Sequence, residues 1–86
     1  MLGVVSYAIC IERFLRDNPG KYFSAYELVA VLESRFGYSY AEVHSVRRGV
    51  KKLVNRDKVF YYDKVVHEAG VWGKRRFYTF NRSLLR

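Results

Sequence analysis

The chain has 86 residues, which is enough for one hydrophobic core and too few for two, so we expect a single domain over residues 1–86. Half of the residues are hydrophobic and 17% are aromatic, which argues against an intrinsically disordered chain. Sixteen lysines and arginines against eight aspartates and glutamates give a net charge of +8, so we expect a polyanionic partner, with nucleic acid ahead of an anionic membrane surface. A solvated basic surface without any partner is the alternative interpretation of this charge.

The N-terminal stretch and the single cysteine indicate the compartment. Residues 1–11 are apolar, but they lack the basic start and the small-residue cleavage site of a signal peptide, and Glu12 interrupts them well short of a membrane span. Cys10 has no partner for an intramolecular disulfide, which fits a reducing environment. We therefore expect a core helix in a cytoplasmic protein, or in the host cytoplasm if the protein is viral, with no membrane contact.

The first predicted helix runs from Val4 to Arg16, where apolar residues recur at three- and four-residue spacings. Asp17-Asn18-Pro19-Gly20 ends it, because proline cannot continue a helix and glycine permits a tight reversal. The next three residues, 21–23, are expected to form a short extended bridge.

Two capping-box spacings predict the next two helices. In residues 24–27 the serine oxygen is placed to cap one free amide, and the glutamate three positions later is placed to reach back to another. The helix that begins there is expected to end at Gly37, because glycine best tolerates the left-handed conformation after a helix. Residues 39–42 repeat the spacing, so a third helix is expected from Tyr40 to Asn55.

Two runs of β-branched and aromatic residues, from Val59 to Val66 and from Arg76 to Phe80, predict paired strands. The segment between them, from His67 to Arg75, is too long for a two-residue turn and contains two glycines. We therefore expect a protruding basic hairpin tip, with Trp72 packed beneath it rather than stacked on a ligand.

The third helix has an apolar stripe and an opposite face that is small or basic at every turn. The apolar stripe contains Val43, Val46, Val50, Leu53 and Val54. The opposite face contains Ala41, His44, Ser45, Arg48, Lys52 and Asn55. A helix in the major groove needs such a face, because small residues let the backbone approach while arginine pairs with guanine. A solvated amphipathic helix is the alternative, which is disfavoured by the five cations Arg47, Arg48, Lys51, Lys52 and Arg56.

Candidate DNA contacts lie on the third helix and on the hairpin. Arg48 is the best candidate for reading a base, and His44 and Ser45 are candidates for a base or a phosphate. The hairpin cations are candidates for phosphates or for the minor groove. The complete set is Tyr40, Ala41, His44, Ser45, Arg47, Arg48, Lys51, Lys52, Lys74, Arg75 and Arg76.

No catalytic or metal-binding spacing links the reactive side chains of the sequence. His44 falls on a basic helix, His67 on a hairpin and Cys10 within an apolar helix. We therefore expect no enzymatic activity, no cofactor, no metal and no small-molecule ligand.

The order of these elements resembles the winged helix-turn-helix superfamily, with a hairpin that returns as Gly73-Lys74-Arg75-Arg76-Phe77-Tyr78-Thr79-Phe80. This strand, basic and then aromatic, is similar to the strand that follows the wing in PadR and MarR regulators. The small size of the chain is similar to that of winged-helix proteins of archaeal viruses and plasmids. The resemblance implies an α+β winged helix in the order helix, strand, helix, helix, strand, wing, strand. It places the recognition helix at Tyr40 to Asn55 and the wing at His67 to Arg76.

The resemblance also implies a function, namely sequence-specific binding of double-stranded DNA by a transcriptional regulator. A small domain without an evident effector pocket favours a repressor. PadR and MarR regulators carry additional dimerisation helices, for which 86 residues leave no room. A homodimer would then use residues 1–11, together with Leu84 and Leu85, unless these residues only complete the core. A protein-protein interaction module and an RNA-binding protein are the alternative functions.

Overall fold

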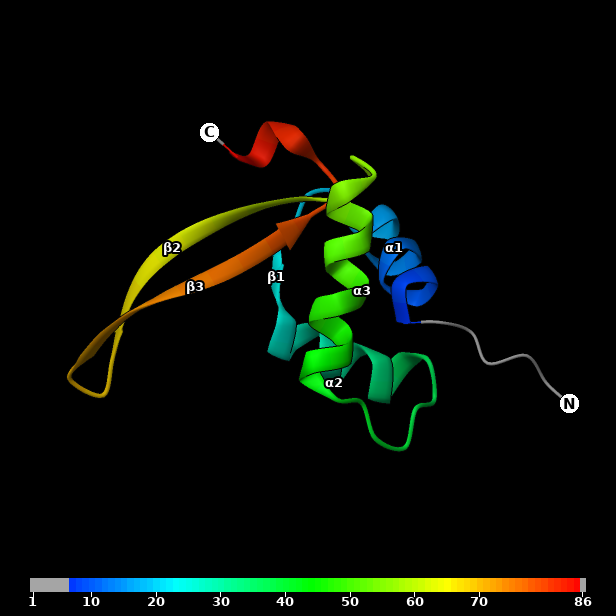
Figure 1. Cartoon of the computed structure of the whole chain (residues 1–86), viewed down its shortest axis with the longest axis horizontal. Helices are drawn as coiled ribbons and strands as arrows, with labels where there is room; N and C mark the ends of the chain where they lie inside the picture. The colour runs from blue at the N-terminus through cyan, green and yellow to red at the C-terminus, as the bar shows by residue number, and fades with distance from the viewer. Residues whose placement is uncertain (1–6, 86) are drawn as a thin grey trace, which may run out of the picture.

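Three helices and a three-stranded antiparallel sheet make up the computed structural model, which describes residues 7–85 (Figure 1). The elements are α1 (Tyr7–Asp17), β1 (Phe23–Ser24), α2 (Ala25–Arg35), α3 (Val43–Asn55), β2 (Phe60–Glu68), β3 (Val71–Thr79) and a 3₁₀ helix, η1 (Arg82–Leu85). The predicted order of elements is confirmed. The predicted start of the first helix at Val4 lies outside the described residues, and no helix within residues 7–85 is long and apolar enough to cross a membrane.

The core lies where the three helices meet the base of the sheet. Its fully buried side chains come from every helix and from the strand region: Ile11, Leu15, Leu28, Leu32, Val46, Val50, Val59 and Thr79. Leu53 is also buried, so the predicted apolar stripe of α3 faces the core. Cys10 and Ile11 are buried within this core, which supports core completion rather than dimer contact for these two residues. The side chains of Leu84 and Leu85 lie outside what the structure describes.

Gly49 lets α3 approach α1 closely. It is buried in the middle of α3, and a Cβ added there would lie 3.3 Å from the backbone nitrogen of Ala8. That distance is tighter than ordinary van der Waals contact, so a larger side chain would push the two helices apart.

The capping box at the start of α2 is confirmed. The Glu27 N–H donates to Ser24 Oγ at 3.3 Å, and the Ser24 N–H donates to Glu27 Oε1 at 2.9 Å. After the helix, Gly37 adopts a φ of 74°, the left-handed conformation expected of it. The signals for this helix are local, since both bonds lie within four consecutive residues.

The predicted start of the third helix at Tyr40 is wrong. The helix begins at Val43, and its N-cap is Glu42, whose side chain makes no capping hydrogen bond. The physical reason is tertiary: Ala41 is only 5% exposed, and its N–H donates to Glu33 Oε2 of α2 at 3.0 Å. Burial of Ala41 and this bond hold the chain in a non-helical path, so Ser39 precedes the helix without capping it.

The two serines therefore offer a matched pair of variants. Ser24→Ala should lower the free energy of unfolding by about 1 kcal/mol, because it removes a helix cap. Ser39→Ala should change it by less than about 0.5 kcal/mol, because Ser39 is exposed and caps nothing. Urea unfolding followed by circular dichroism measures both values. Equal losses would contradict the observed start of α3.

The expected long hairpin tip, from His67 to Arg75, is wrong as well. Strands β2 and β3 stay paired from Phe60↔Thr79 to Glu68↔Val71, so the turn consists of Ala69 and Gly70 alone. Both turn residues have positive φ, 53° and 78°, which matches the twist of a two-residue hairpin turn. The result is a long two-stranded ribbon that projects away from the helices (Figure 1).

The hairpin is fixed to the helices at its base. Strand β1 pairs with β3 at Phe23↔Tyr78 and Ser24↔Phe77, directly before α2. Beside this pairing, the ring of Tyr22 lies edge-on to Tyr62 at 5.2 Å and to Phe77 at 5.4 Å between centroids. Burial raises the pKa of Tyr62 to about 12, and its hydrogen bond to Tyr22 acts in the same direction.

This raised pKa predicts an alkaline loss of stability. An unfolded tyrosine titrates near 10, so the contribution of Tyr62 is complete below that pH and is lost as the pH rises toward about 12. Tyr62→Phe should therefore reduce the fall in unfolding free energy across this range, as measured by urea unfolding at stepped pH. Tyr40→Phe is the control, because Tyr40 is 72% exposed. An unchanged fall in Tyr62→Phe would contradict the assignment.

Candidate nucleic-acid interface

The solvent side of α3 is strongly basic. Exposed side chains on it include His44, Arg47, Arg48, Lys51, Lys52 and Asn55, followed by Arg56 at the C-cap. Within residues 7–85, none of the five lysines and arginines in this set forms an ion pair. Such a row of uncompensated cations attracts a polyanion more strongly than a row whose charges are already paired.

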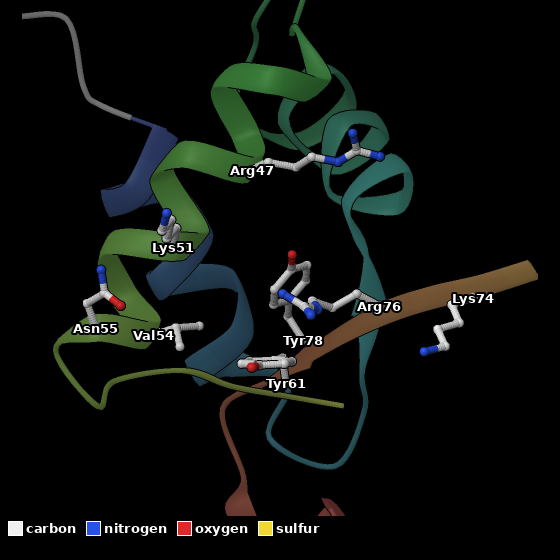
Figure 2. Close-up of a pocket in the computed structure, with 8 residues that line it drawn as sticks. All are labelled: Arg47, Lys51, Val54, Asn55, Tyr61, Lys74, Arg76 and Tyr78. Carbon is white, nitrogen blue, oxygen red and sulfur yellow. The ribbon is translucent and has the colours of Figure 1, made fainter. Parts of the chain in front are cut away.

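An open depression separates α3 from the hairpin, with a volume of about 540 Å³. Figure 2 shows the side chains that line it: Arg47, Lys51, Val54 and Asn55 from α3, and Tyr61, Lys74, Arg76 and Tyr78 from the two strands. Tyr78 is buried, and this burial raises the pKa of its hydroxyl, so Tyr78 is uncharged there at neutral pH. Cations from α3 and from β3 therefore border one shared hollow.

The register of the hairpin decides which side chains face this depression. Successive residues of a strand point to opposite faces, so the face that carries Tyr61 and Tyr78 also carries six further residues. We call this the inner face, and it consists of Tyr61, Asp63, Val65, His67, Trp72, Lys74, Arg76 and Tyr78. The outer face carries Tyr62, Lys64, Glu68, Arg75 and Phe77 among others.

Arg76 is held in an internal ion pair on the inner face. Its Nε donates to Asp63 Oδ1 at 2.7 Å and its Nη2 donates to Asp63 Oδ2 at 3.1 Å. The guanidinium also lies over the ring of Tyr61, 4.0 Å from the centroid (Figure 2). The hydrogen bond from Arg76 lowers the pKa of Asp63, and the same bond raises the pKa of Arg76.

Of the other two hairpin cations, Arg75 forms an ion pair and Lys74 forms none within residues 7–85. Arg75 pairs with Glu68 on the outer face, with Nη1 3.1 Å from Oε1. Lys74 is on the inner face and makes no ion pair with any residue that the structure describes. Of the three predicted hairpin contacts, Lys74 is therefore the one without an ion pair among the described residues, although its charge helps to lower the pKa of Asp63.

The predicted helix contacts fall on two flanks of α3. Arg47 and Lys51 face the hairpin, and the guanidinium of Arg47 lies 5.6 Å from the ring centroid of Tyr26. Ser45, Arg48 and Lys52 border a second depression, about 470 Å³, between α3 and α1. Arg48 Nη2 donates to Ser45 Oγ at 3.2 Å, which orients the guanidinium along the helix.

Tyr40 and Ala41, which precede α3, differ in exposure to solvent. Tyr40 is 72% exposed, and its carbonyl oxygen accepts a hydrogen bond from the Tyr7 hydroxyl at 3.4 Å. Ala41, predicted to lie on the exposed face of the helix, is buried in the core instead. That prediction is wrong because Ala41 precedes α3, and its backbone N–H is bonded to Glu33 of α2.

Trp72 also departs from the prediction. It was expected to pack beneath the hairpin, but its side chain is 70% exposed and stacks on His67, the residue directly opposite, at 4.3 Å between centroids. Asp63, Tyr61 and Tyr26 were not predicted as parts of the site at all. The alternation of β2 together with a turn at Ala69–Gly70 would have placed Asp63 opposite Arg76.

Comparison with solved structures finds a likeness to a crystal structure of Bacillus subtilis PadR in complex with operator DNA. The TM-score is 0.63 with 20% sequence identity, and the matched region covers 90% of this chain and 40% of the PadR chain. The fold is a winged helix. The predicted fold class, an α+β winged helix, is thereby confirmed, with the β2–β3 hairpin as its wing. No family model matches the chain, and no curated protein matches it.

Proposed function

We propose that this winged helix is a sequence-specific double-stranded DNA-binding transcriptional regulator that acts as a repressor. The observation that carries the proposal is the shared depression, where uncompensated cations of α3 and Lys74 of the wing face the same space. The likeness to PadR, solved with operator DNA, supports it independently of the charges. Repression would follow from occupancy of the site, since a bound domain excludes other proteins from the same stretch of duplex.

In this proposal α3 enters the major groove. His44, Arg48 and Asn55 are exposed on this helix, and the short side chains of Ser45 and Asn55 allow the helix backbone to come close. Arg48 donates one of its five guanidinium N–H groups to Ser45. The other four remain available, and two of them are enough for a bidentate contact with guanine. Arg47, Lys51 and Lys52 flank this row at positions suited to phosphates.

The wing, residues 67–76 with their flanking strands, would lie along the adjacent backbone or minor groove. Lys74 is ready for a phosphate contact, since it has no ion pair within the described residues. Arg75 and Arg76 each have to exchange a carboxylate partner for a phosphate before they contribute. We therefore assign the helix cations and Lys74 the larger share of the affinity.

The test is a salt series with a fluorescein-labelled duplex of random sequence, followed by anisotropy. The logarithm of the affinity should fall by about 0.9 per phosphate neutralised for each decade of salt. Arg48→Ala with Lys52→Ala should weaken binding by more than about tenfold and flatten this slope, and Lys74→Ala should flatten it by about 0.9. Arg13→Ala with Arg16→Ala removes two charges from the exposed surface of α1 and is the control.

Three outcomes would count against the proposal. Absence of duplex binding at low salt contradicts DNA binding altogether. Equal weakening by the α1 control contradicts a defined interface, because net charge alone would then account for the binding. Tighter binding to single-stranded RNA than to duplex DNA favours the RNA-binding alternative, in which the exposed aromatic side chains stack on bases.

The wing can be observed directly, because Trp72 is the single tryptophan of the chain and is 70% exposed. Saturating duplex DNA should protect its fluorescence from acrylamide, since the inner face of the wing is then covered. A variant with Trp72→Phe and Tyr22→Trp moves the probe to the outer side of the hairpin base and should show no protection. Full quenching of Trp72 in a complex that anisotropy shows to be saturated would contradict the wing contact.

A further inference from the structure

The wing carries two ion pairs, one on each face. Asp63 pairs with Arg76 on the inner face, toward α3, while Glu68 pairs with Arg75 on the outer face. Arg76 lines the depression together with Lys74, Arg47 and Lys51, so the carboxylate of Asp63, paired with Arg76, is an acidic group beside a surface rich in cations. A carboxylate at that place lowers the local positive potential toward the proposed DNA.

The geometry of the inner pair resembles the way in which a guanidinium holds a phosphate. Arg76 uses two donors side by side, Nε and Nη2, on the two oxygens of Asp63 at 2.7 and 3.1 Å. Phosphates are bound through the same bidentate pattern, so a phosphate and the carboxylate compete for the same donors. The ring of Tyr61 supports the guanidinium from one side, which keeps it at this position on the inner face.

The pair is open to exchange, since the side chains of Arg76 and Asp63 are 48% and 40% exposed. A phosphate can therefore reach Arg76, but only by displacing the carboxylate that already occupies its donors. Displacement removes the ion-pair partner of Asp63 and leaves the carboxylate, with only the more distant charge of Lys74 near it, beside the DNA backbone, where like charges repel. Contact between Arg76 and an arbitrary phosphate thus brings little net gain.

We infer that Asp63 is a specificity-determining residue, which limits binding to DNA of arbitrary sequence by holding Arg76 in an internal ion pair on the inner face of the wing. This inference rests on the proposed DNA-binding function. A duplex that fits α3 and the wing together presents a phosphate where the exchange is compensated by the other contacts. A duplex that fits poorly leaves the Asp63–Arg76 pair closed.

The experiment compares five proteins on a fluorescein-labelled duplex of random sequence: wild type, Asp63→Asn, Arg76→Gln, the double variant, and Glu68→Gln. Asp63→Asn should bind about five- to tenfold more tightly near 0.1 M salt, with a salt slope steeper by about 0.9, because one more phosphate is neutralised. The double variant should bind like wild type, because the pair and its neutral replacement carry the same net charge. Glu68→Gln removes the same charge from the outer face and should have a smaller effect.

A second comparison addresses specificity itself. A duplex enriched by the wild-type protein from a random library serves as the probe beside the random duplex. The ratio of affinities for the enriched and random duplexes should fall in Asp63→Asn, since binding to arbitrary sequence gains more. Thermal unfolding of each variant by circular dichroism shows that every protein compared is folded.

Some results would overturn the inference about Asp63, and a different result would overturn the proposed function. If Asp63→Asn binds the random duplex no better than wild type, or more weakly, the inference is overturned, and Asp63 instead positions Arg76 for contact. A double variant much weaker than wild type on random duplex overturns it as well, because Arg76 then contributes despite its partner. Equal gains in Asp63→Asn and Glu68→Gln also overturn it. If wild type and all variants fail to bind duplex DNA, the proposed function itself has failed.

Discussion

The arrangement of helices and wing depends on one residue position at the junction between them. Ser24 caps α2 through its side chain, and it pairs with Phe77 of β3 as the last residue of β1. The start of α2 and the base of the wing are therefore held by the same buried residue. Since α2 also packs against α3, the pairing sets the direction in which the hairpin leaves the body, and with it the depression where the cations of α3 and Lys74 meet.

The sequence was sufficient wherever the deciding interactions are local. Helix α2 follows from Ser24 and Glu27, which bond to each other within one turn, and the basic face of α3 follows from helical periodicity. The same capping pattern at Ser39 failed because contacts with another helix overrode it: Ala41 is buried and bonded to Glu33. Local spacing contains no information about such a partner.

The errors in the wing have a single origin. The turn at Ala69–Gly70 lacks the asparagine or aspartate that usually marks a two-residue turn with positive φ, so the loop was predicted too long. Without the turn, the register is unknown, and without the register neither the Asp63–Arg76 pair nor the stacking of Trp72 on His67 can be predicted. The charges themselves were visible in the sequence; which of them are neutralised was decided by cross-strand pairing.

The close approach of α1 and α3 at Gly49 bears on the search for relatives of this protein. Surface cations can be replaced or shifted over evolutionary time, and at 20% identity to PadR the overall sequence likeness is weak. Position 49 has less freedom, because a Cβ there would lie only 3.3 Å from the backbone nitrogen of Ala8, and α1 or α3 would have to shift to accept it. We therefore expect sequences that share this helix pairing to keep a very small residue at that position, even where the surface cations differ.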